Sequence, residues 1–189
     1  MMQAIRLRLR PALARLIRDP RGVTAVEFAM VAPLMIALYF GCVEVSVGVG
    51  AQRKVSLTSA TLANLTAQVT SISKSEMDDI LAASSAIISP YSAANLSMSV
   101  SCLSIDSDKN VTVKWSVASG GATILTSATV PTALLVADTQ LIYAEAAYAY
   151  TPAVGYTITG TLNLKDRMYM SPRISAPAYD DGTTVNACT

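Results

Sequence analysis

A run of sixteen uncharged and mostly apolar residues, positions 28–43, is the feature that most constrains this chain. Extended back to position 23, the stretch reaches 21 residues and is interrupted only by Glu27. A helix of that length spans about 30 Å, the thickness of the hydrocarbon core of a bilayer. We therefore expect one transmembrane helix. Pro33 lies inside the run and should kink this helix, because the carbonyl of Ala29 loses its hydrogen-bond partner.

The charges around the apolar run predict its orientation. Six arginines and a single acidic residue, Asp19, precede it within residues 1–21, whereas only Arg53 and Lys54 follow it closely on the other side. Positive charge concentrates on the cytoplasmic side of membrane proteins. We therefore expect a basic cytoplasmic leader over residues 1–22, with the chain beyond position 45 on the exported side.

The composition argues against several function classes. The chain has no histidine, which is the commonest general base and the commonest metal ligand. Its three cysteines are not in metal-ligand spacing, and no basic stripe for nucleic acid continues past the leader. We therefore expect a protein that is not an enzyme, with no catalytic residue, metal site, cofactor, small-molecule substrate or nucleic-acid partner.

The helix is predicted to continue out of the membrane through residues 45–70. This segment lacks proline, and apolar residues recur in it at helical spacing: Val55, Leu62, Leu65 and Val69. Ser73 followed by Glu76 is a capping-box pattern, which predicts a second helix that runs to about residue 88, before Pro90.

Beyond residue 90 the pattern becomes typical of strands. Short strand-like runs are predicted at residues 98–103, 111–117, 140–150 and 156–164, and the tail, residues 171–189, is predicted to be loop-like. The predicted fold class is α+β: a long N-terminal transmembrane helix, a second helix and a small antiparallel sheet. The predicted divisions are a leader (1–22), the membrane and extended helix (23–70) and an exported-side domain (71–189).

One motif joins the leader to the helix. Gly22 closes the leader, the helix begins at Val23, and Glu27 is its fifth residue. This arrangement resembles the cleavage site of type IV prepilins, in which a peptidase cuts after the glycine. Glycine leaves the scissile bond unhindered. Cutting there frees an amine on Val23, about 6 Å along the helix axis from Glu27. A carboxylate in lipid costs on the order of 2.5 kcal/mol without a cationic partner, and the freed amine can be that partner.

The resemblance narrows to the TadE/TadG-like family of tight-adherence (Tad/Flp) pilus proteins. It rests on R-G-V-T-A-V-E-F-A-M-V-A-P-L at residues 21–34, on Tyr148-Ala-Tyr150-Thr-Pro152, and on Met170-Ser-Pro172-Arg173. The family resemblance implies a minor pilin-like (pseudopilin) subunit for pilus assembly, processed by a prepilin peptidase.

The same resemblance implies the partners and the location. The partners would be the prepilin peptidase, other pilin or pseudopilin subunits, inner-membrane assembly proteins and membrane lipid. The location would be the bacterial inner membrane, with a periplasmic C-terminal domain and incorporation into the pilus as a further option. The alternative is an uncleaved single-pass protein whose periplasmic domain scaffolds the assembly.

Two cysteines on the exported side are candidates for a disulfide. Cys102 falls in a predicted strand and Cys188 lies one residue from the end of the chain. An oxidising compartment permits them to pair and so to pin the tail, provided that their Cα atoms approach within about 7 Å. The alternative is two free thiols. Cys42 lies in the membrane run and is interpreted as inert packing.

Overall fold

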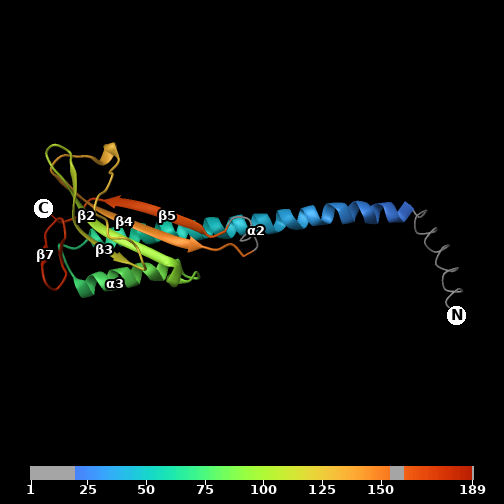
Figure 1. The fold of residues 1–189 in the computed structure, drawn as a ribbon, viewed down its shortest axis with the longest axis horizontal. Helices are drawn as coiled ribbons and strands as arrows, with labels where there is room; N and C mark the ends of the chain where they lie inside the picture. The colour runs from blue at the N-terminus through green and yellow to red at the C-terminus, as the bar shows by residue number, and fades with distance from the viewer. Residues whose placement is uncertain (1–19, 154–159, 189) are drawn as a thin grey trace. The chain divides into compact units, whose positions relative to one another are not determined.

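The computed structural model describes residues 20–153 and 160–188, drawn in colour in Figure 1. Most of the predicted leader, residues 1–19, therefore lies outside the described residues. The chain divides into two compact units, Met1–Val45 and Ser46–Thr189, and helix α2 (Pro20–Thr66) contributes to both. The α+β class is confirmed, because a long N-terminal helix and a short second helix are followed by antiparallel strands.

The second part of α2 forms one wall of the core of the Ser46–Thr189 unit. Its buried residues recur every three or four positions and most are small: Ala51, Val55, Thr58, Ser59, Leu62, Ala63 and Thr66. Small side chains let a sheet approach the helix closely. The hydroxyls of Thr58 and Ser59 donate to helix carbonyls one turn earlier, so they are buried with a partner. The helix ends at Thr66, four residues before the predicted limit.

The second helix begins where its capping box predicts. Strand β1 (Ser71–Ser73) leads into α3 (Lys74–Ser85), followed by the 3-10 turn η1 (Ala86–Ile88). The backbone N–H of Ser73 donates to the Glu76 carboxylate over 2.8 Å, and the N–H of Glu76 donates to the Ser73 hydroxyl over 3.4 Å. Two N–H groups that the first helical turn leaves unpaired are thereby satisfied. Met77 and Leu81 then point into the core.

The main sheet has four antiparallel strands in the order β3-β2-β4-β5. The strands of this sheet are β2 (Leu96–Ile105), β3 (Val111–Ser119), β4 (Thr139–Tyr150) and β5 (Leu162–Met170). The short 3-10 turn η2 (Ala93–Asn95) precedes β2, and the 3-10 turn η3 (Thr132–Leu134) precedes β4. The first three contain the predicted runs and extend them slightly.

The last strand of the main sheet was predicted at residues 156–164, and the observed strand shares only residues 162–164 with that range. Residues 154–159 lie outside the described residues, and the observed strand β5 extends from Leu162 to Met170. Its run Lys165-Asp166-Arg167 breaks the apolar alternation, because an edge strand exposes charged side chains that a central strand could not. Pairing with β4 therefore continues past the charged residues, up to Met170 opposite Ile142.

The two faces of this sheet are covered differently. On the inner face, Val100, Ile142 and Ala144 share one apolar core with α2 and α3. On the outer face, a smaller cluster joins Leu103 and Tyr143 to residues of the segment that links β3 to β4. We call residues 121–129 of that linking segment the arm.

The tail contains two short strands, which corrects the prediction that residues 171–189 are loop-like. β6 (Ala178–Asp180) pairs in parallel with β1, and β7 (Val185–Asn186) pairs antiparallel with β6. Strands of two or three residues show no alternation of apolar and polar residues that a sequence could reveal. The partner of β6 on its other side, β1, lies more than a hundred residues earlier, so only the folded chain brings these two strands together.

Candidate functional site

The first part of α2 presents an apolar surface that the other described residues do not cover. Among the described residues, one helix is long and apolar enough to cross a membrane, and the side chains of its apolar window are not buried in the protein. Val23 is 59% exposed and Phe28 is 72% exposed. Exposing so much apolar surface to water is unfavourable, so this segment fits a single-pass membrane protein.

Gly22, Val23 and Glu27 lie together at the start of this helix. The bond between Gly22 and Val23 falls in the first turn of α2, which begins at Pro20, a residue favoured at helix starts. Glu27 follows Val23 by four residues, so the two positions share one face of the helix. The Glu27 side chain is exposed and has no hydrogen-bond or ion-pair partner among the described residues. Its pairing with a freed amine remains a prediction.

Pro33 lies inside α2. Helical residues continue on both sides of it, so the missing N–H does not end the helix. The predicted kink stays a prediction. Cys42 is exposed on the same segment and is not bonded to another cysteine.

Two tyrosines lie against the turn of α2 that follows the apolar segment, and a third packs on one of them. The hydroxyl of Tyr91 donates to the carbonyl of Val47 over 3.1 Å, and its ring lies 6.0 Å from that of Tyr148. A methyl group added at Gly48 would meet the ring of Tyr150 at 3.8 Å. Tyr148 and Tyr150 belong to the Y-x-Y-x-P pattern noted in the sequence. That pattern therefore supplies aromatic packing against α2 rather than a chemical site.

The second patterned stretch, Met170-Ser-Pro172-Arg173, holds the tail on the end of α2. The Arg173 guanidinium donates to the Asn64 side-chain oxygen over 2.7 Å, and its backbone N–H donates to the carbonyl of Ala67 over 3.0 Å. These bonds satisfy a carbonyl that the helix end leaves open. Further along, the indole N–H of Trp115 donates to the carbonyl of Pro177 over 3.0 Å.

A disulfide fixes the end of the tail to the middle of the sheet. Cys102 in β2 is bonded to Cys188, with the two Cα atoms 6.0 Å apart. Both residues are buried in the core that α2 shares with the sheet. The bond closes a loop with a sequence separation of 86 residues, so it links the last residues of the chain to its centre.

Reducing this disulfide is expected to destabilise the Ser46–Thr189 unit. For a loop of this length, chain-entropy models give a loss of about 4 kcal/mol in the free energy of unfolding. Denaturant unfolding of the full chain in detergent, with and without reductant, measures the loss. The variant Cys42→Ser is the matched control and should leave it unchanged. Recovery of the protein from an oxidising compartment with Cys102 and Cys188 both open to alkylation would contradict the pairing.

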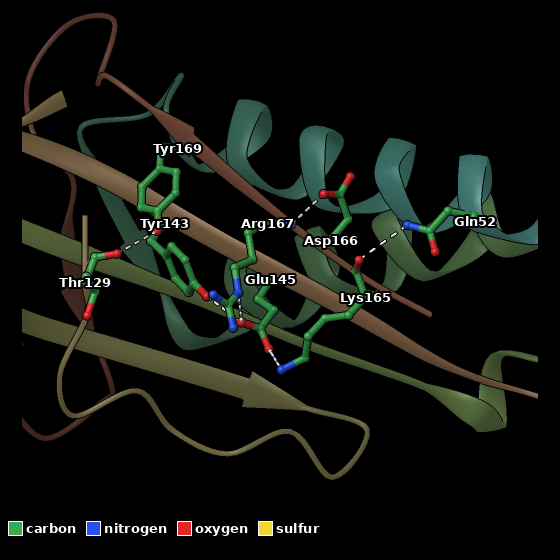
Figure 2. Close-up of polar contacts among 8 residues, drawn as sticks. All are labelled: Gln52, Thr129, Tyr143, Glu145, Lys165, Asp166, Arg167 and Tyr169. Atoms are coloured by element: carbon green, nitrogen blue, oxygen red, sulfur yellow. Dashed lines mark hydrogen bonds and ion pairs between the residues drawn. The ribbon is translucent and has the colours of Figure 1, made fainter. Parts of the chain in front are cut away.

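A charged cluster lies on the outer face of the main sheet. Glu145 in β4 accepts from Lys165 Nζ over 2.5 Å and from Arg167 Nε over 3.0 Å, both in β5 (Figure 2). It also accepts a short hydrogen bond from the hydroxyl of Tyr143. The ring of Tyr169 lies 5.1 Å from that of Tyr143, and its hydroxyl donates to the carbonyl of Thr129 in the arm over 3.2 Å.

The protonation states in this cluster follow from its surroundings. Burial raises the pKa of Glu145, but the hydrogen bonds from Lys165 and Tyr143 and the nearby charges outweigh burial, so the net pKa is lowered. Burial and the bond to Glu145 raise the pKa of Tyr143 far above its usual range. At neutral pH the cluster therefore holds one carboxylate, two cations and a neutral phenol that donates a hydrogen bond.

Sequence reasoning did not predict this cluster. Its members come from two strands, and only the register of β4 against β5, with Glu145 opposite Arg167, brings them together. A lone glutamate in an otherwise apolar strand was the available signal. The acidic segment Asp106–Asn110, between β2 and β3, is a hairpin turn in which Asp106 accepts from the backbone N–H of Asn110 over 2.7 Å. Among the described residues, no group of three or more acidic or cysteine side chains could hold a metal ion.

In the part of the chain that the structure describes, these observations define a class: a protein with an exposed apolar helix that continues into the core of a disulfide-linked α+β domain. Residues 22–63 match the model of the family described as TadE-like protein, which confirms the predicted resemblance over this segment. The match begins at Gly22 and covers Glu27, Pro33 and the first residues that α2 contributes to the core. No curated protein and no solved structure matches the chain.

Proposed function

We propose that this chain is a minor pilin-like subunit for assembly of a Tad/Flp-type pilus, processed by a prepilin peptidase after Gly22. The observation that carries the proposal is the TadE-like match over residues 22–63, which coincides with the exposed apolar helix. In a pilin-like subunit one such helix has two successive roles: it is first a membrane anchor and then a surface for packing against the helices of other subunits. The exposed apolar side chains of α2 support both uses.

The orientation and the partners belong to the same proposal. The arginines of residues 1–21 support a cytoplasmic N-terminus, and the disulfide supports an exported, oxidising location for the Ser46–Thr189 unit. The proposed partners are the prepilin peptidase, other pilin or pseudopilin subunits, inner-membrane assembly proteins and lipid. The absence of histidine from the whole chain supports a structural role over an enzymatic one.

The second candidate function is an uncleaved single-pass protein whose periplasmic domain scaffolds pilus or secretion assembly. It is favoured by one observation: the bond between Gly22 and Val23 is helical, and a helical bond is less accessible to a peptidase than an unwound one. Both candidates require association with the pilus machinery, whereas they differ in the N-terminus of the mature chain.

Association with the pilus machinery is tested by co-purification from a pilus-producing strain. We expect an affinity-tagged chain to retain pilin or assembly proteins after mild detergent extraction, and a strain without the chain to lose surface pili. Re-expression of the chain should restore the pili. Normal piliation without the chain, together with no retained pilus protein, would contradict both candidate functions.

A further inference from the structure

A hollow lies on the outer face of the main sheet, between the arm (residues 121–129) and strand β5. Its volume is about 590 Å³. Its floor is low because the positions that face it on the central strands carry small side chains, Ser97 and Ser99 in β2 and Ala147 in β4. Larger apolar residues at these positions would fill the hollow, as Leu103 and Leu141 fill the other end of the same face under the segment before η3. We call this hollow the groove.

The charged cluster forms one side of the groove and is not electrically balanced. Lys165 and Arg167 carry two positive charges against the single negative charge of Glu145, and all three side chains line the groove. Arg167 uses its Nε to bind Glu145, which leaves its two terminal amino groups without a partner among the described residues. The Arg167 side chain is 57% exposed and that of Lys165 is 44% exposed. Glu145 fixes both cations in place while their remaining donors face solvent.

The arm forms the opposite side and offers backbone groups. The hydroxyl of Ser116 accepts from the N–H of Leu125 over 2.9 Å, and Tyr169 holds the carbonyl of Thr129. Between these two fixed points the backbone has no regular structure, and Thr126 and Ser127 are exposed. Their N–H groups have no partner among the residues that the structure describes. Exposed backbone N–H groups of this kind can donate hydrogen bonds to the carbonyl groups of an extended peptide.

We propose that the groove binds an extended peptide segment of a partner protein through a side-chain carboxylate. The carboxylate would accept two parallel hydrogen bonds from the terminal amino groups of Arg167, assisted by Lys165, while the peptide backbone pairs with the arm. One carboxylate neutralises the net charge of the cluster. A phosphate dianion would overcompensate that charge and would meet stronger repulsion from Glu145. The proposal does not depend on cleavage after Gly22 or on a role in a pilus.

The test is a titration of the full chain in detergent micelles with two pools of fluorescently labelled pentapeptides. One pool carries Asp at the centre, with Val, Thr or Ala elsewhere, and the other carries Asn in place of Asp. We expect the Asp pool to raise the fluorescence anisotropy at concentrations at least tenfold lower than the Asn pool does. Arg167→Gln should weaken binding of the Asp pool about tenfold, because a charge-assisted hydrogen-bonded pair is lost.

The matched control is Lys114→Gln, which removes an exposed cation from β3 without touching the groove. It should leave the affinity unchanged, and thermal unfolding should show that both variants are folded. Equal binding of the two pools, or equal affinity of Arg167→Gln and the unaltered chain, would overturn the proposal. Competition with unlabelled ligands gives a further test. Inorganic phosphate or glucuronate that displaces the Asp pool as readily as unlabelled Asp peptide does would also overturn the proposal, in favour of a simple anion site or a sugar site.

Discussion

A chain that carries Gly22→Val is expected to remain at full length in cells that process the unaltered chain. The β-branched side chain places two methyl groups beside the bond between residues 22 and 23, where the proposed peptidase requires an unhindered backbone. Gel mobility and intact mass of the membrane-extracted protein measure the result. We expect the unaltered chain to lose residues 1–22 and the variant to retain them.

Two further variants separate bulk at the bond from other effects. Gly22→Ala adds a single methyl group but raises helix propensity more than valine does, so it tests whether helix stability alone blocks cutting. Ala25→Val places the same valine side chain one turn further along the helix, at an exposed position away from the scissile bond. We expect both to be processed. Normal processing of Gly22→Val would show that the cleavage site has been misplaced.

Loss of co-assembly is the expected result of Glu27→Gln. The change removes the charge of the Glu27 side chain and keeps its shape. Membrane insertion should proceed at least as well, because a neutral amide is easier to bury in lipid than a carboxylate. Cleavage should also proceed, because the scissile bond lies a full helical turn earlier. Packing against partner subunits should fail, because the freed amine on Val23 would then be buried without a countercharge.

Crosslinking of the membrane-extracted variant to its pilus partners, with a parallel check of its N-terminus, measures this effect. Glu27→Asp is the matched control, since it keeps the charge on a side chain shorter by one methylene and should retain most of the co-assembly. A plain membrane anchor predicts that Glu27→Gln loses nothing. Co-assembly of the cleaved Glu27→Gln chain at the level of the unaltered chain would therefore rule out the charge pair.

The elements with strong local signals could be predicted from the sequence. The apolar run of residues 23–43 indicated a helix by its length, which is enough to span a bilayer. Ser73 with Glu76 starts α3 because the capping box is complete within four residues. Strand β3 was predictable for a similar reason. Its apolar residues alternate with polar ones along the chain: Val111, Val113, Trp115 and Val117.

The elements that depend on distant partners could not be predicted in this way. β6 and β7 are too short to show a period, and they exist because β1 and the Cys102–Cys188 bond hold the tail against the core. The register of β5 against β4 follows from pairing along the whole strand, so the charged cluster around Glu145 was missed with it. The groove also depends on the arm, whose position is fixed by Ser116 and Tyr169.

The central claim is our proposal that this chain, whose residues 22–63 match the TadE-like family, is a substrate of a prepilin peptidase. The N-terminal residue of the mature protein tests this claim most directly. The protein should be purified from membranes of cells with and without the peptidase, and its N-terminus determined by sequencing and intact mass. Our account predicts a chain that begins at Val23 when the peptidase is present and at the start of the leader when it is absent. A chain that retains residues 1–22 in both cells would contradict processing and favour the uncleaved scaffold.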